Sequence, residues 1–229
     1  MTIAQNYEII RERMQKACER AGRKEQEVHL VAVSKYVETE RIAEVIALGQ
    51  RLFGENHAQE LVEKKTFFEH HGCDVHFIGQ LQTNKIKYVC GSASMIESVD
   101  RVGLAEALQR KSEALNLVSE ILIQVNIGNE AQKGGVAPED LDSFMELLNG
   151  CSNLRPRGLM CVPPALPQEE TRPYFRRMRQ LFEQTKLRYG ALNMDTLSMG
   201  MSHDFEVAIE EGATEVRVGT ALFGARGKL

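Results

Sequence analysis

The chain has 229 residues, of which 43% are apolar and 26% charged, and its formal net charge is −4 at pH 7. This length is enough to bury a large core, and the slight acidity argues against nucleic-acid binding, which normally needs a concentrated basic patch. No stretch approaches the roughly 20 consecutive apolar residues of a membrane span, and the charged, amphipathic residues 1–20 are unlike a secretory signal. We therefore expect a cytoplasmic protein.

The cysteine spacing and the even composition of the chain bear on metal binding and on the number of domains. The five cysteines include no C-x-x-C pair, and with the six histidines they show no metal-ligand spacing. We expect reduced, mostly buried thiols and no metal. No low-complexity linker or composition shift divides the chain, so we predict one domain over residues 1–229.

Taken in chain order, the predicted elements begin with a helix and then alternate between strand and helix. The helix is indicated by spacings of three and four at Ile3, Tyr7, Ile10, Met14, Ala17 and Ala21, and Gly22 provides a left-handed stop. Strands are expected at 29–35, 51–55, 74–79, 94–98, 120–126, 155–161, 195–199 and 214–219. Helices are expected at 38–49, 58–70, 101–114, 138–148, 168–188 and 204–212. This order is typical of a parallel α/β fold.

The alternation fits two architectures, a doubly wound sheet and a closed (β/α)8 barrel. Eight predicted strands, and a length near the lower end of the barrel range, favour the barrel. Neither G-x-G-x-x-G nor the P-loop pattern occurs, which weakens a nucleotide-binding sheet. We therefore predict a single-domain (β/α)8 TIM barrel with an extra N-terminal helix.

Polar residues end several of the predicted strands, where barrels build their active sites. They are Lys35, Glu55, Asn56, Asn126, Ser198 and Arg217. Because side chains alternate between the faces of a strand, Val216 and Val218 can pack on helices only if Arg217 points into the barrel. A guanidinium cannot lose its proton there, so it must find acceptors.

Lys35 and Arg217 together indicate a specific chemistry. A partly buried lysine beside another cation exposes its amine lone pair and can form a Schiff base with a carbonyl compound. In a closed barrel the last strand lies beside the first, which brings Arg217 near Lys35. Ser202 at a helix start and the Gly219-Thr220 turn offer backbone N–H groups to an anion, at the place where barrels often bind phosphate. This set predicts a pocket for pyridoxal phosphate (PLP).

Each of these residues also has an ordinary structural explanation when taken alone. Lys35 can reach the barrel mouth as a solvated lysine, and Arg217 can pair with Glu215 or another internal carboxylate. The serine and the glycine turn can be plain capping elements. Asp204 argues against the phosphate site, because its charge in the first helical turn opposes an anion unless its side chain points away.

Six segments resemble the pyridoxal phosphate homeostasis proteins, a family related to the barrel domain of alanine racemase. They are LVAVSK (30–35), FGENHAQE (53–60), HFIGQLQTNK (76–85), VNIGNEAQKGG (125–135), RGLMCVPP (157–164) and LSMGMSHDFEVAIEEGATEVRVGTALFGAR (197–226). The resemblance spans nearly the whole chain from residue 30 onward. It implies an alanine-racemase-like barrel that binds PLP.

The resemblance also implies a role for each site residue. Lys35 would form the aldimine and Arg217 would bond the pyridine nitrogen. Near the ring it places Asn56 and His76, and the phosphate would be held by Ser202, Gly219 and Thr220. Ser198, at the end of its strand, completes the predicted cofactor-binding set.

Three departures from the family pattern affect the rim of the predicted pocket. Gln80 follows the glycine where a histidine is common, residues 203–205 read HDF where DDL is usual, and Tyr36 directly follows the lysine. They leave the cofactor assignment unchanged.

Two functions remain open, a PLP carrier and a weak amino-acid racemase or other PLP enzyme. Racemisation needs a second acid or base on the opposite face of the substrate, which alanine racemase takes from an additional domain and a partner subunit. We expect none here, because the chain ends ten residues past Gly219 and strand alternation points Tyr36 away from Lys35. A cofactor-free, aldolase-like barrel would leave the phosphate cradle unexplained. We therefore predict a non-catalytic, monomeric protein of vitamin B6 homeostasis that buffers PLP or delivers it to apoenzymes.

Overall fold

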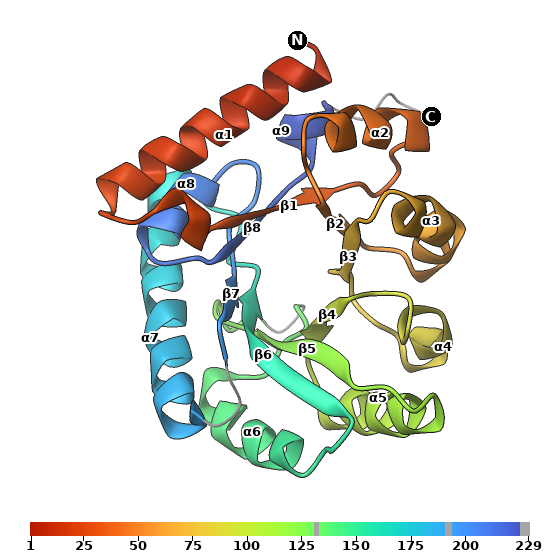
Figure 1. The fold of residues 1–229 in the computed structure, drawn as a ribbon. Helices are drawn as coiled ribbons and strands as arrows, with labels where there is room; N and C mark the ends of the chain where they lie inside the picture. Colours follow the sequence, from red (N-terminus) through yellow and green to blue (C-terminus); the bar gives the residue numbers. More distant parts are fainter. Residues whose placement is uncertain (131–132, 191–193, 225–229) are drawn as a thin grey trace.

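Eight parallel strands close into a barrel in a computed structural model that describes residues 1–130, 133–190 and 194–224 (Figure 1). Each strand pairs with the next along the chain, and the last returns to the first. The strands are β1 (His29–Val33), β2 (Leu52–Glu55), β3 (Asp74–Phe77), β4 (Met95–Val99), β5 (Ser119–Val125), β6 (Leu154–Cys161), β7 (Thr196–Ser198) and β8 (Glu215–Val218). The predicted barrel is confirmed, and all eight predicted strands overlap an observed one.

The helices lie outside the barrel, around the closed ring of strands (Figure 1). They are α1 (Ile3–Arg20), α2 (Thr39–Ala47), α3 (Ala58–His70), α4 (Ile86–Val89), α5 (Val102–Ala114), α6 (Leu141–Asn149), α7 (Arg172–Arg188), α8 (Phe205–Glu210) and α9 (Thr220–Phe223). The short helices α4 and α9 were not predicted, because four residues are too few to show helical periodicity. None of the helices in these ranges is both long and apolar enough to cross a membrane.

The extra N-terminal helix α1 packs across α8, α9 and α2. It begins with a capping box, in which the Thr2 side chain accepts from the Gln5 backbone and the Gln5 side chain accepts from the Thr2 backbone. Its buried face includes Ile10, Met14 and Ala17, as the spacing predicts. The helix ends before Gly22, whose φ of 64° is the predicted left-handed stop.

Strand alternation divides the buried side chains into two sets. Val216 and Val218 belong to the large apolar core between strands and helices, whereas Glu215 and Arg217 turn inward. A small separate cluster of Met95, Leu122 and Met160 fills part of the barrel interior. The remaining interior positions near β3, β4, β7 and β8 carry polar and charged side chains.

Candidate functional site

A cleft of about 590 Å³ opens where the strands end, the end at which TIM barrels place their active sites. Its lining includes six of the eight predicted site residues: Lys35, Asn56, Ser202, Arg217, Gly219 and Thr220. They come from the segments after β1, β2 and β7 and from β8 with the turn that follows it. The other two, His76 and Ser198, do not line the cleft and lie one layer deeper in the barrel.

Lys35 lies in the turn just after β1 and is half-buried. β1 pairs directly with β8, with Val31 opposite Arg217, so the lysine and the arginine come from neighbouring strands. Tyr36 is different from the prediction. Since β1 ends at Val33, strand alternation does not govern Tyr36, which adopts a left-handed φ of 60° and lines the same cleft. Tyr36 is 56% exposed, and its ring contacts the ring of His57.

Asn56 brings a buried polar atom to the cleft wall. Its Oδ1 has no hydrogen-bond partner among the described residues. The backbone here is fixed by Gly79 after β3, where a Cβ atom would lie 2.1 Å from the Asn56 carbonyl oxygen. Only glycine allows so close an approach. Asn56 is therefore held rigidly, with an amide oxygen that a bound ligand can satisfy.

The predicted anion corner joins the segment after β7 to the start of α9. Ser202 Oγ accepts a hydrogen bond from Ala221 N at 3.3 Å, so it does not cap α8 as predicted. Asp204 occupies the N-cap position of α8 instead. Its Oδ1 accepts from Met201 N at 2.7 Å, and the residue is fully buried outside the cleft lining. The Asp204 carboxylate therefore turns away from the cleft.

Gly219 is packed against the first strand, and this fixes the turn between β8 and α9. A Cβ atom at Gly219 would lie 3.2 Å from both the Cβ and the carbonyl oxygen of Val33. This is tighter than an ordinary side-chain contact, so a larger residue would push the turn away from β1. Thr220, the first residue of α9, follows directly and lines the cleft.

Arg217 forms the inner wall of the cleft, and hydrogen bonds in the barrel interior fix its guanidinium. Only 4% exposed, it donates from Nη1 to Ser198 Oγ at 2.5 Å and from Nη2 to the Cys161 carbonyl at 2.8 Å. Glu97 Oε2 lies 3.7 Å from Nη1 and accepts from Ser198 Oγ at 2.6 Å. The alternative of an internal ion pair is thus realised with Glu97 rather than Glu215, while Arg217 still faces the cleft.

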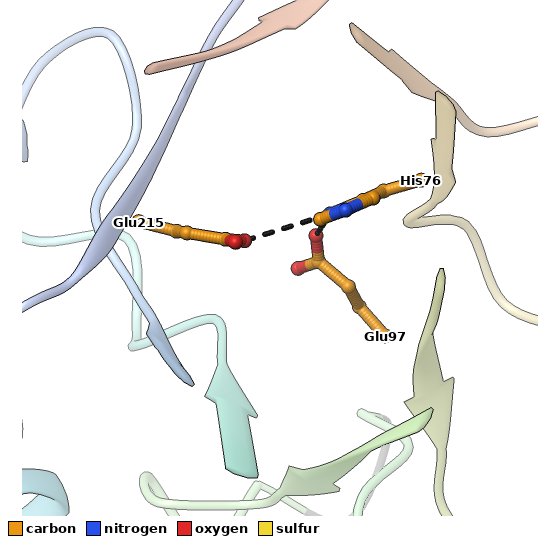
Figure 2. Close-up of side chains that lie close together, drawn as sticks. All are labelled: His76, Glu97 and Glu215. Carbon is orange, nitrogen blue, oxygen red and sulfur yellow. Dashed lines mark hydrogen bonds and ion pairs between the residues drawn. The ribbon is translucent and has the colours of Figure 1, made fainter. Parts of the chain in front are cut away.

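Behind Arg217, three ionisable side chains from β3, β4 and β8 converge in the barrel centre (Figure 2). His76 Nδ1 lies 2.8 Å from Glu97 Oε1 and 3.5 Å from Glu215 Oε2. Burial opposes the imidazolium charge, but the nearby carboxylates of Glu215 and Glu97 outweigh it and raise the pKa of His76 to about 10. Burial likewise opposes the charge of Glu97, whose pKa is nevertheless lowered by His76 and Arg217.

These three residues are spaced like metal ligands, with donor atoms within 4.8 Å of one another. Within the group Glu97 is hydrogen-bonded to His76 and Ser198, whereas Glu215 Oε2 has no hydrogen-bond partner among the described residues. Two carboxylates face the His76 imidazolium and the Arg217 guanidinium, so the group has no net charge. His76 therefore supplies the positive charge that a metal ion would bring.

Sequence reasoning missed Glu97 as part of the site, although it predicted the partners of Glu97, which are His76, Ser198 and Arg217. Glu97 lies in a predicted strand, but only the pairing of β3 with β4 brings it to His76. A glutamate inside a mostly apolar strand, Met95–Val99, is the signal that could have marked it. The described cysteines are free thiols, as predicted.

Comparison with known proteins identifies the family. The sequence family described as "Alanine racemase, N-terminal domain" matches residues 3–227. A pyridoxal phosphate homeostasis protein of Aquifex aeolicus is 46% identical over 227 residues, which is 99% of either chain. The chain belongs to the pyridoxal phosphate homeostasis protein family. A second relative of that name, from Pseudomonas aeruginosa, is 41% identical and covers 98% of this chain and 96% of its own.

A solved structure of this family shows the same fold. It is the Synechococcus elongatus protein PipY, described as having PLP bound. PipY is 35% identical to this chain, superposes with a TM-score of 0.81, and matches 94% of this chain and all of its own length. The predicted resemblance to pyridoxal phosphate homeostasis proteins, and to the alanine racemase barrel, is confirmed.

The buried His76 predicts a specific pH dependence of stability. Its folded-state pKa of about 10 lies above the ordinary value of 6.5, so its stabilisation is complete below pH 6.5 and is lost as the pH rises towards 10. We expect the free energy of unfolding, measured by urea titration, to fall more steeply over this range in the wild type than in a His76→Gln, Glu215→Gln double variant. Equal slopes would contradict a buried imidazolium. The exposed His71→Gln serves as the control.

Proposed function

We propose that this chain binds PLP covalently through Lys35, keeps a reserve of it in the cytoplasm, and delivers it to PLP-dependent apoenzymes. The observation that carries the proposal is the meeting of Lys35, Arg217 and the Ser202–Thr220 corner in one cleft. The relatives' name and the PLP described for PipY support the same cofactor. We also propose that residues 1–229 form one domain that acts as a monomer.

The residues of the cleft fit the chemical groups of PLP. When bound, PLP supplies an aldehyde, which an amine such as that of Lys35 can attack. The buried Asn56 Oδ1 lacks a partner in the described structure, and a Cβ atom at Gly219 would crowd Val33 at 3.2 Å. Ser202 and the Gly219-Thr220 backbone would hold the phosphate.

Arg217 favours storage over catalysis. Its guanidinium keeps its proton and is fixed by Ser198 and the Cys161 carbonyl, so it would meet a ring nitrogen as a permanent cation. A fixed cation disfavours protonation of that nitrogen and weakens the electron sink that carbanion chemistry uses.

The rest of the cleft offers a catalyst little protection from water. Apart from Lys35 and Arg217, its described ionisable residues are exposed: Tyr36, Glu38, Arg41 and His203. An exposed acid gives weak general acid catalysis, because water screens its charge and competes for its proton. We therefore propose a carrier from which cofactor can exchange. The alternative is a weak racemase, for which Tyr36 is the available acid at the rim.

The first test replaces Lys35 by Ala. Borohydride reduction should trap PLP on the wild type and leave the variant without covalent cofactor, because the amine that attacks the aldehyde is gone. The fold should persist, since Lys35 lies in a turn and outside the apolar core. Mass spectrometry of the reduced proteins gives the answer, with the exposed Lys85→Ala as control. PLP attached to another lysine in Lys35→Ala, at the wild-type level, would overturn the assignment.

A second test addresses the phosphate corner. Ser202→Ala with Thr220→Ala should weaken the binding of PLP much more than that of pyridoxal, which lacks the phosphate. Each charge-assisted hydrogen bond lost is worth roughly 1.5 to 3 kcal/mol. Fluorescence titration with both compounds measures the difference, and Thr83→Ala on the surface is the control. An equal loss for both compounds would place the phosphate elsewhere.

A third test separates carrier from enzyme. The PLP-loaded protein should not exchange the α-proton of L-alanine or similar amino acids at an enzyme-like rate, because no buried acid is described opposite Lys35. Deuterium incorporation from D₂O, followed by NMR, measures this exchange, with Lys35→Ala and Tyr36→Phe as comparisons. Exchange faster than about 1 s⁻¹, the low end of ordinary turnover, that both variants abolish would establish the racemase instead.

A further inference from the structure

Lys64 is a buried lysine outside the cleft. It lies on α3, faces the barrel from outside, and is only 8% exposed. Its Nζ donates to the Ser34 carbonyl at 2.8 Å, to Glu55 Oε1 at 3.1 Å and to Glu60 Oε1 at 2.6 Å. Burying an ammonium group is costly, and an apolar side chain could pack α3 against the barrel equally well. The hydrogen bonds of Lys64 therefore call for a purpose beyond packing.

The partners of Lys64 hold the residues on both sides of Lys35. On one side, Ser34 is fully buried, and its Oγ donates to Glu55 Oε1 at 2.6 Å while its carbonyl accepts from Lys64. On the other side, Tyr36 N donates to Glu60 Oε1 at 2.5 Å. One ammonium group thus ties together the two carboxylates and the carbonyl that fix the backbone around Lys35.

The backbone at this point needs such support. Val37 N donates to the Ser34 carbonyl at 3.0 Å, which closes a tight turn over Lys35 and Tyr36. Tyr36 takes the left-handed φ of 60° in this turn, a conformation that is unfavourable for any residue with a side chain. The hydrogen bond to Glu60 offsets part of that cost. Without the hydrogen bond to Glu60, we expect the turn to relax and the Lys35 amine to move from its present position.

We propose that Lys64, with Glu55 and Glu60, positions Lys35 for attack on the aldehyde of PLP. The inference rests on the proposed function. It adds three residues that do not line the cleft and that act through the carbonyl and hydroxyl of Ser34 and the backbone N–H of Tyr36. Placement of the reacting atoms strongly controls rates, and an error of about 1 Å costs on the order of 100-fold. The positioning set should therefore govern covalent attachment rather than cofactor recognition.

The test compares PLP with pyridoxamine 5′-phosphate, which carries the same ring and phosphate but has an amine where PLP has its aldehyde. In a Glu55→Gln, Lys64→Met double variant, which removes the buried pair together, covalent attachment of PLP should slow by about 10- to 100-fold. The affinity for pyridoxamine 5′-phosphate should stay at the wild-type value. Stopped-flow absorbance gives the rate, and fluorescence titration gives the affinity.

Two further variants keep the test decisive. Lys65→Met changes the next residue on the same helix, whose Nζ bonds the Gly91 carbonyl at the surface, and should behave as wild type. If the double variant does not fold, Glu60→Gln keeps an acceptor for Tyr36 N but weakens the bond to Lys64, and it should slow attachment by a smaller factor. If the double variant loses affinity for pyridoxamine 5′-phosphate by the same factor as its attachment of PLP slows, the role is merely structural and the proposal is overturned. An attachment rate equal to that of the wild type would also overturn it. A wild type that takes up no covalent PLP would instead refute the proposed function.

Discussion

The mutual neutralisation of four buried charges is the interaction on which the site depends. Glu97 and Glu215 face the His76 imidazolium and the Arg217 guanidinium in a barrel interior that side chains fill. Removing one partner would leave an uncompensated buried charge, which is far more costly than replacing a whole pair. Because these residues come from β3, β4 and β8, the strands must keep their register for Arg217 to keep its place. The inner wall of the cleft is therefore fixed by the closure of the barrel itself.

Lys35 is fixed by a second and separate group of charges, outside the barrel. Arg217 is held from the interior through Ser198 and Glu97, whereas the turn that carries Lys35 is held from α3 by Glu60 and Lys64. Burial raises the pKa of Glu55 in this outer group, although Lys64 opposes that effect, which marks how little water reaches it. The two groups share no residue. Changes to one should therefore leave the other intact, as expected for sites without common partners.

Local sequence patterns predicted where the strands lie and which of their side chains point into the barrel. The partners of the site residues depend on pairing between distant strands, which local patterns do not show. Alternation along residues 214–219 correctly placed Arg217 inside, because burial leaves the valines only the helix side. The same rule failed for Tyr36, since β1 stops at Val33 and a turn with its own geometry follows. Glu97 was not predicted as part of the site, because its partners belong to other strands. Ser202 does not cap α8 as predicted for a similar reason: its Oγ accepts from Ala221 N in α9, 19 residues along the chain.

A buried inner wall and an exposed outer edge of the cleft suit both the binding and the release of PLP as proposed. Arg217, proposed to meet the PLP ring, is held by the buried Ser198 and by the carbonyl of the buried Cys161, so little conformational entropy of this side chain would be lost when the cofactor binds. The rim residues Tyr36, Glu38, Arg41 and His203 are exposed, and no buried acid stands among them. Water would therefore reach the proposed link between Lys35 and PLP from this side, and hydrolysis of that link would free the cofactor. An enzyme of the same fold needs the opposite arrangement, because catalysis gains from excluding water and from an acid on the second face. The exposed rim thus suits a protein that must give its cofactor away.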